Sequence, residues 1–219
     1  MARRKRRMVT AAELVAKLEA DPEYRRKERE QERKRAAFEA ELAKDEANLV
    51  KDLARAGVRV TSVWDLVNTQ EPYPNAIPVL LDHLKRSHHR RIREGIVRAL
   101  SVPEAQDIAF SDLYREFQSI SVEEDFQLKW LVGGALAEAT TPSELPLVLD
   151  LIKDPQHGKG RELLICVLKR LPPEERRRIA GELSASLDDP GLVQTAKSLQ
   201  GGPDRPKPAR SSRRRNDPI

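Results

Sequence analysis

The chain has 219 residues, of which 34% are charged and only 4% are aromatic, and its formal net charge is +5. No apolar run approaches the roughly 20 residues that a membrane-spanning helix needs, so we expect no membrane segment and no membrane partner. The single cysteine, Cys166, excludes an intramolecular disulfide and is typical of a reducing compartment, so we expect a cytoplasmic protein.

Positive charge is concentrated towards the two ends of the chain. Residues 1–60 hold 17 Lys and Arg against 12 Asp and Glu, and residues 200–219 hold 6 against 2. Residues 61–199 hold 17 against 21, so the middle of the chain is mildly acidic. A polyanion is therefore expected to bind the ends of the chain rather than its body.

The first 60 residues predict a basic arm followed by a helical extension. Residues 1–9 contain five Arg and Lys and predict a disordered arm, and no apolar segment follows as a signal peptide would require. Residues 10–60 form the extension, in which Thr10 and Glu13 match a capping box and predict a short first helix.

A long charged helix is predicted over about 22–56. Asp21 and Pro22 are typical of a helix start and Gly57 of a stop, and strong helix formers fill the interval. Its first half is polar on every face, whereas from Phe38 onward apolar residues return at helical spacing. We therefore expect the helix to project at its N-terminal end and to pack at its C-terminal end. Because its polar half lacks an a/d pattern, a lone helix in a monomer is favoured over a coiled coil.

An internal repeat organises the middle of the chain. Residues 76–100 align with residues 144–168 without a gap, and many of the positions that are not charged pair apolar with apolar. A repeat of two amphipathic segments at this period predicts a stacked array of helix pairs. The identical pairs include Pro78 with Pro146, Asp82 with Asp150, His89 with His157, Arg93 with Arg161 and Glu94 with Glu162.

The predicted fold is all-α, with a short α-solenoid of about four helix pairs over residues 61–199 after the long charged helix. Thr61 or Ser62 opens a short helix ahead of the pairs. The Pro-, Gly- and Arg-rich residues 200–219 predict a disordered basic tail. The expected pairs are 74–86 with 88–101, 105–119 with 122–139, 142–153 with 158–170, and 173–187 with 190–199.

A proline inside the first helix, a short turn and a basic residue early in an apolar second helix resemble HEAT repeats. The closest variety is the short HEAT-like unit of bacterial proteins, a group that includes phycobilin-lyase-type repeats. The resemblance covers residues 74–170 and, more loosely, 173–199. It implies that the second helices line a concave face that binds proteins or sometimes nucleic acid. It also implies that the early basic residue bonds an acid in a nearby turn, as Asp154 would for Arg161; the matching basic residues are Arg93, Lys129 and Arg161.

The exposed stripe of the second helices is the predicted partner-binding surface. Trp130 is its most informative member, because an indole at the centre of a concave face beside arginines has the composition of a binding hot spot. The alternative interpretation places Trp130 in the seam between repeats, where it only covers its neighbours. Gly133 and Gly134 predict close packing or curvature at the same helix. The predicted partner-binding residues are Arg91, Glu94, Arg98, Trp130, Lys159 and Glu162.

Basic clusters provide an alternative function as a nucleic-acid-associated factor. Terminal clusters of Arg and Lys would bind RNA or DNA nonspecifically through counterion release, or would only aid solubility. The basic run from Lys85 to Arg98 would hold phosphates or an acidic peptide, or would be a solvated helix face. The terminal residues concerned are Arg3, Arg4, Lys5, Arg6, Arg7, Arg213, Arg214 and Arg215.

Signals of catalysis and metal binding are weak. The four histidines match no zinc-binding spacing, and Cys166 lies between Ile165 and Val167 with no base nearby, as a core thiol would. We therefore expect no catalytic residues, no metal and no cofactor. The sequence predicts a non-enzymatic intracellular adaptor that binds a protein or peptide on the concave face of the array.

Overall fold

A computed structural model of the chain describes Thr10, Lys17 and residues 20–200. These residues form helices and turns and contain no β-strand, which confirms the all-α class. The same part of the chain contains no helix long and apolar enough to span a membrane. The basic arm, most of the first short helix, the tail beyond Gln200 and both terminal basic clusters lie outside the described residues.

The long helix α2 spans Pro22–Arg55, close to the predicted 22–56. Asp21 caps its start, where Oδ1 accepts the backbone N–H two residues further on at 2.9 Å. Pro22 stands in the first turn, where its missing N–H costs nothing. Gly57 ends the helix with a φ of 84°, in the left-handed region that glycine adopts without strain.

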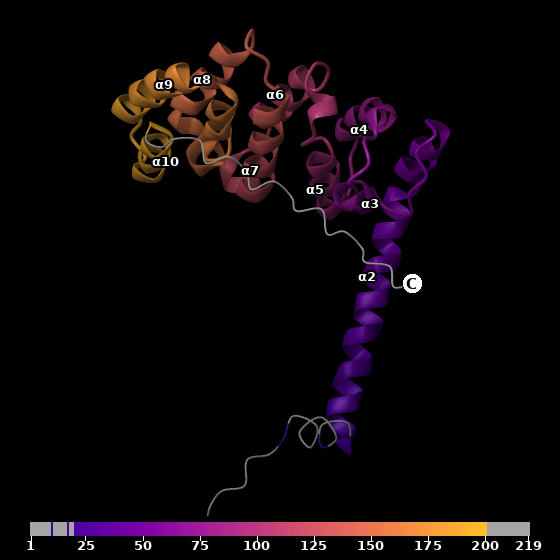
Figure 1. Cartoon of the computed structure of the whole chain (residues 1–219). Coiled ribbons are helices and arrows are strands. Elements are labelled where there is room, and N and C mark those ends of the chain that lie inside the picture. The colour runs from indigo at the N-terminus through magenta and orange to yellow at the C-terminus, as the bar shows by residue number, and fades with distance from the viewer. Residues whose placement is uncertain (1–9, 11–16, 18–19, 201–219) are drawn as a thin grey trace, which may run out of the picture.

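Among the described residues, only the C-terminal part of α2 packs on other helices. Residues 22–41 are exposed along their whole length, whereas Leu49 and Leu53 are completely buried. The exposed half carries ion pairs at helical spacing, such as Lys34 Nζ with Glu30 Oε1 at 2.7 Å. The N-terminal half of α2 therefore extends away from the other helices, as Figure 1 shows.

Shorter helices follow α2, and their boundaries agree with most of the predicted pairs. Their order is α3 (Val63–Asn68), η1 (Pro74–Ala76), α4 (Ile77–Leu84), α5 (Arg90–Ala99), η2 (Pro103–Ala105), α6 (Phe110–Ser119), α7 (Val122–Ala139), α8 (Leu145–Lys153), η3 (Pro155–Arg161), η4 (Leu164–Arg170), α9 (Pro173–Ser186) and α10 (Pro190–Gln200), where η denotes a 3-10 helix.

These helices lie in two layers (Figure 1). We define the first layer as α4, α6, α8 and α9, and the second layer as α3, α5, α7, the η3–η4 segment and α10. Within the second layer each element packs on the next, from α3 to α5, α7, the η3–η4 segment and α10. By contrast, α4, α6 and α8 make few contacts with one another. The second layer is therefore the continuous one.

The second helix predicted over 158–170 is wrong in type, because the structure has two 3-10 helices there, η3 and η4. Gly158 has a φ of 47°, which interrupts any regular helix at that residue. Beyond it, the carbonyl oxygen of Gly160 would lie only 3.0 Å from a Cβ added to Gly133. The segment thus follows the surface of α7 closely, and this packing replaces α-helical geometry. It also confirms that the Gly133-Gly134 pair serves close approach.

Lys129 and Arg161 have the same structural role in successive helix pairs. The nearly buried Lys129 Nζ donates to the carbonyl oxygens of Phe117 at 2.9 Å and Ile120 at 2.6 Å, at the end of α6. Arg161 Nη1 donates to the carbonyl oxygen of Ile152 at 3.0 Å, near the end of α8. Each cation therefore satisfies backbone oxygens that a helix end leaves without partners.

The acid that lies nearest to Arg161 is Asp188 and not the expected Asp154. Asp154 caps η3 by accepting a backbone N–H at 2.9 Å, and the carboxylate nearest to Arg161 belongs to Asp188, at 3.5 Å. Arg93 bonds Glu116 of α6, so it links two neighbouring pairs. The three matching basic residues are thus structural, but they do not form one uniform ladder.

α3 is fastened to the packed end of α2. Ser62 and Asp65 form a capping box at its start, which confirms the predicted opening of this helix. The buried Glu46 of α2 accepts hydrogen bonds from Ser62 Oγ at 3.1 Å and from the backbone N–H of Val63 at 3.2 Å. The C-terminal part of α2 and α3 therefore pack as a helix pair ahead of α4 and α5.

A line of four side chains joins α2 to α4 and the turn after it. Asp45 Oδ2 lies 3.1 Å from Nδ1 of His88, whose Nε2 lies 3.0 Å from Nδ1 of His83. The line ends where His83 Nε2 lies 3.1 Å from Asp52 Oδ2. His83 is 1% exposed, so this polar contact is an internal part of the α2 docking site.

Candidate functional site

The predicted partner-binding residues lie along the second layer, where they differ in exposure. The side chains of Arg91, Arg98 and Lys159 are exposed, and those of Glu94, Trp130 and Glu162 are half-buried. They come from α5, α7 and the η3–η4 segment, which pack in sequence.

Trp130 and Glu162 are in direct contact. The indole Nε1–H of Trp130 donates to Glu162 Oε2 at 3.3 Å, which links α7 to the residue between η3 and η4. The indole is therefore partly in the seam between pairs, as the alternative interpretation held, while part of it remains open to solvent. Next to it, a Cβ on Gly134 would lie 2.9 Å from Leu163 Cδ1, so α7 packs closely on the η3–η4 segment at this glycine.

A second tryptophan, Trp64, lies on α3 of the same layer and is also half-buried; it is absent from the residues predicted for the site. The guanidinium carbon of Arg91 lies 5.3 Å from the ring centroid of Trp64, within the range of a cation–π interaction. The Trp64 Nε1 atom is buried and has no hydrogen-bond partner. Gly95 lets α5 pack closely on α3, because a Cβ there would lie 2.5 Å from Val63 Cγ1. The sequence did contain a signal for Trp64, since this residue lies in a short amphipathic helix directly before the predicted helix pairs.

Arg90 connects α5, which packs on Trp64, to α7, which carries Trp130. Its Nε donates to Asp125 Oδ2 at 2.9 Å and its Nη2 to Gln127 Oε1 at 2.6 Å, while Glu94 lies 3.3 Å from the same guanidinium. Asp125 has non-helical angles (φ −149°, ψ 75°) and accepts the backbone N–H of Leu128, so it caps the main part of α7 from inside. The hydrogen bonds to Asp125 and Gln127 hold α5 and α7 in a fixed register.

We call the resulting surface the second-layer band. It crosses α3, α5, α7 and the residue between η3 and η4, and it alternates partly exposed indoles with charged and amide side chains. Its members are Trp64, Arg90, Arg91, Glu94, Arg98, Gln127, Trp130 and Glu162.

The basic run from Lys85 to Arg98 is largely neutralised by nearby acids of α4, α6 and α7. Lys85 Nζ lies 2.8 Å from Asp112 Oδ2, and Arg86 pairs with Asp82. Arg90 and Arg93 are paired as described above. This result favours the solvated, structurally paired interpretation of the run over a phosphate site.

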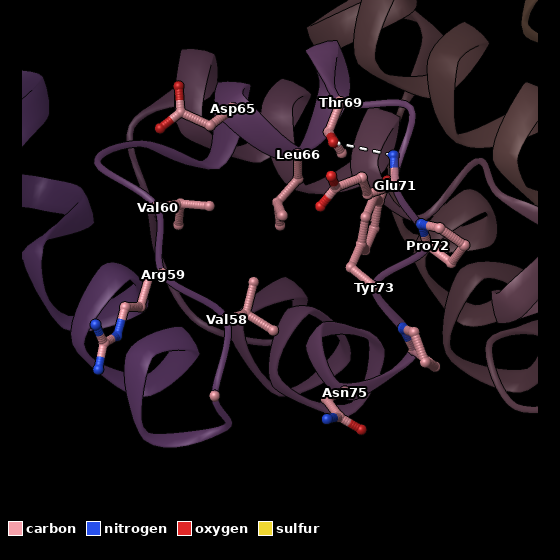
Figure 2. A pocket seen from close by; sticks show the side chains of 12 residues that line it. Val58, Arg59, Val60, Asp65, Leu66, Thr69, Glu71, Pro72, Tyr73 and Asn75 are labelled. Carbon is pink, nitrogen blue, oxygen red and sulfur yellow. Dashed lines mark hydrogen bonds between the residues drawn. The ribbon is translucent and has the colours of Figure 1, made fainter.

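A cavity of about 430 Å³ lies elsewhere, between the end of α2, α3 and η1. Figure 2 shows Val58, Leu66 and Tyr73 pointing into it. The Tyr73 hydroxyl donates to the carbonyl oxygen of Ala99 at 3.0 Å, and burial raises the pKa of Tyr73 to about 12. Thr69 Oγ1 accepts the backbone N–H two residues later at 3.1 Å. Thr69 therefore serves the local turn, whereas Tyr73 ties the wall of the cavity to the end of α5.

Within residues 20–200 we find no group of three His, Cys, Asp or Glu side chains placed to hold a metal ion. Cys166 is half-buried between the buried Ile165 and Val167. No protein-family model, curated protein or solved structure matches the chain. Its function must therefore be argued from its own residues.

Proposed function

We propose that this chain is a short HEAT-like α-solenoid that works as a non-enzymatic intracellular adaptor and binds a protein or peptide on its second layer. The observation that carries the proposal is the second-layer band. Partly exposed indoles at Trp64 and Trp130, set among arginines and carboxylates, have the composition of protein-binding hot spots.

Unequal packing of the two layers supports a concave binding face. The second-layer helices touch continuously, whereas α4, α6 and α8 of the first layer are spread apart. A stack that is closer on one side curves towards that side, so the second layer would form the inner surface. A band on an inner surface can contact a ligand from several helices at once.

The chemistry of the band indicates the kind of segment that it would bind. Arg91 and Arg98 offer exposed guanidinium groups for carboxylates, and Glu162 offers an acceptor beside the Trp130 ring. An extended or helical peptide with an apolar side chain next to acidic residues would satisfy both groups. The hydrogen bonds of Arg90 pre-organise this surface before binding.

Site-specific photo-crosslinking would test where a partner binds. A photoreactive amino acid is placed at Gln127 or Arg98 in the second layer, and as a control at Leu147 or Asp150 in the first layer, all of which are exposed. The full chain is then irradiated in cells of its source organism. Crosslinks to one defined protein from the second-layer positions alone are expected.

A substitution pair completes this test. Trp130→Ala is expected to weaken binding of the crosslinked partner by at least tenfold, a typical hot-spot loss. Leu147→Ala removes an apolar side chain that is 45% exposed on the first layer and should leave binding unchanged. Crosslinks from the first layer, or equal affinity of the two variants at unchanged helicity, would refute the proposed face.

A further inference from the structure

The basic residues of α2 are segregated on one side of the helix. At about 100° per residue, a sector of about 120° contains, apart from Pro22, only arginine, lysine and alanine over the whole helix. All nine acidic residues of α2 lie outside this sector. We call it the outward face; it consists of Arg25, Arg26, Arg29, Arg33, Ala36, Ala37, Ala40, Ala43, Lys44, Ala47, Lys51, Ala54 and Arg55.

The outward face is turned away from the array. Leu49 and Leu53, through which α2 packs on the array, lie on the opposite side of the helix, about 160° from the centre of the sector. Every residue of the outward face is exposed. Packing of the array therefore leaves this whole side of α2 accessible.

Most of the cations on the outward face have no acidic partner. Arg55 pairs with Asp52, and Arg29 Nε donates to a backbone carbonyl oxygen of the same helix. The other basic side chains of the face form no ion pair with any acid of the described residues, whereas Lys34 and Arg35, on other sides of α2, are paired. The unpaired cations are Arg25, Arg26, Arg33, Lys44 and Lys51.

The composition of the face selects among anionic partners. A membrane-surface helix needs a large apolar face, and a protein interface needs aromatic or large apolar anchors, but between the cations this face has only alanine. Single-stranded nucleic acid is held by aromatic side chains that stack on bases, and none lies here. A rigid double-stranded backbone needs only a rigid row of cations.

The spacing of the cations fits this partner. Arg26, Arg33, Lys44 and Lys51 lie on nearly one line along the helix, and the first and last are about 38 Å apart at 1.5 Å per residue. The alanines between them let a phosphate backbone approach the helix closely. We propose that the outward face of α2 binds the phosphate backbone of double-stranded nucleic acid without sequence preference, while the array stays free on the other side.

This inference is independent of the proposed adaptor function and of the terminal basic clusters. Its test uses two triple variants of the full chain with equal loss of charge from the same stretch of α2. The first, Arg26→Gln with Arg29→Gln and Arg33→Gln, alters the outward face. The control, Lys27→Gln with Lys34→Gln and Arg35→Gln, alters the other sides. Both variants keep the terminal arms, so any contribution from the arms cancels.

Binding of a labelled DNA duplex of about 24 base pairs is measured by fluorescence anisotropy over a series of salt concentrations. The outward triple variant is expected to bind at least tenfold more weakly near 0.1 M salt. Its slope of log affinity against log salt should fall by about three, or about one for each lost phosphate contact. The control variant should stay close to the original protein, and circular dichroism should show equal helix content.

Three results would overturn the proposal. The first is equal weakening of both variants, or weakening of neither, because the face would then have no special role. The second is competition by polyglutamate as effective as that by unlabelled duplex at equal charge, which would indicate an acidic protein instead. A single strand that binds more tightly than the duplex would also contradict the proposed rigid backbone.

Discussion

His83 Nδ1 lies 3.0 Å from His88 Nε2, and the other nitrogen of each ring lies 3.1 Å from a carboxylate of α2. Two neutral rings supply two N–H groups for these three contacts. Protonation of one ring supplies the third, but protonation of both would set two N–H groups against each other between the rings. The docking of α2 therefore depends on how many protons the pair holds.

Acidification is expected to destabilise the fold through His83. Burial lowers its pKa below the ordinary 6.5, and the nearby charges of Arg86 and His88 act in the same direction, while Asp52 opposes them. The folded state thus binds this proton less tightly than the unfolded chain. The stabilisation is fully present above pH 6.5 and is lost as pH falls through the folded pKa. Urea unfolding at pH 7.5 and pH 5 should show the loss, and an unchanged midpoint would contradict it.

Replacement of Lys129 by methionine should destabilise the fold by about 2–3 kcal/mol, because two backbone carbonyl oxygens lose a buried charged donor. Burial already lowers the pKa of Lys129, yet the hydrogen bonds to Phe117 and Ile120 remain available to the amine. The control is Lys159→Met, an exposed site where the change should stay within about 0.5 kcal/mol. Equal unfolding free energies for the two variants would show that the Lys129 contacts carry no stability.

Two glycine-to-alanine changes should have opposite effects. Gly95→Ala puts a Cβ 2.5 Å from Val63 Cγ1 and should cost about 1–3 kcal/mol. Gly181→Ala, inside α9, meets nothing closer than 3.8 Å and should stabilise the fold by about 0.5–1 kcal/mol through helix propensity. Thermal unfolding measures both changes. A stabilised Gly95→Ala would disprove the close contact between α3 and α5.

Amide hydrogen exchange should divide α2 into two parts. Residues 26–41 have no packing to protect them, so they should exchange close to the rate of a fraying helix. Residues 46–55, which include Leu49 and Leu53, should be protected with the core. Mass spectrometry of peptic fragments would resolve the two parts, and uniform protection of α2 would indicate that its exposed half contacts something else in solution.

The limits of prediction from sequence follow from the range of the interactions involved. The ends of α2 were predictable because Asp21, Pro22 and Gly57 act on their own backbone neighbours. The 3-10 geometry of η3 was not, since it depends on contact with α7, distant in sequence. For the same reason the pairing of Arg90 with Asp125 could not be read from one sequence, although it decides that the basic run is neutralised.

The candidate site was predicted in outline and missed in part. Trp130 and Glu162 lie on the expected layer, but their hydrogen bond joins residues 32 positions apart, and no periodic pattern encodes it. Trp64 was missed because α3 enters the second layer only when the end of α2 supplies its partner helix. The packing of α2 on α3, α4 and α5 is a tertiary interaction, and the repeat in residues 76–168 does not encode it.

The unequal packing of the two layers has a mechanical consequence. Since α5, α7 and the η3–η4 segment touch closely while α4, α6 and α8 do not, bending should be easiest where the first-layer helices move apart or together. The second layer would then keep nearly the same length, while the spacing of the first-layer helices changes. Bending of this kind would let the second-layer band fit proposed ligands of different curvature.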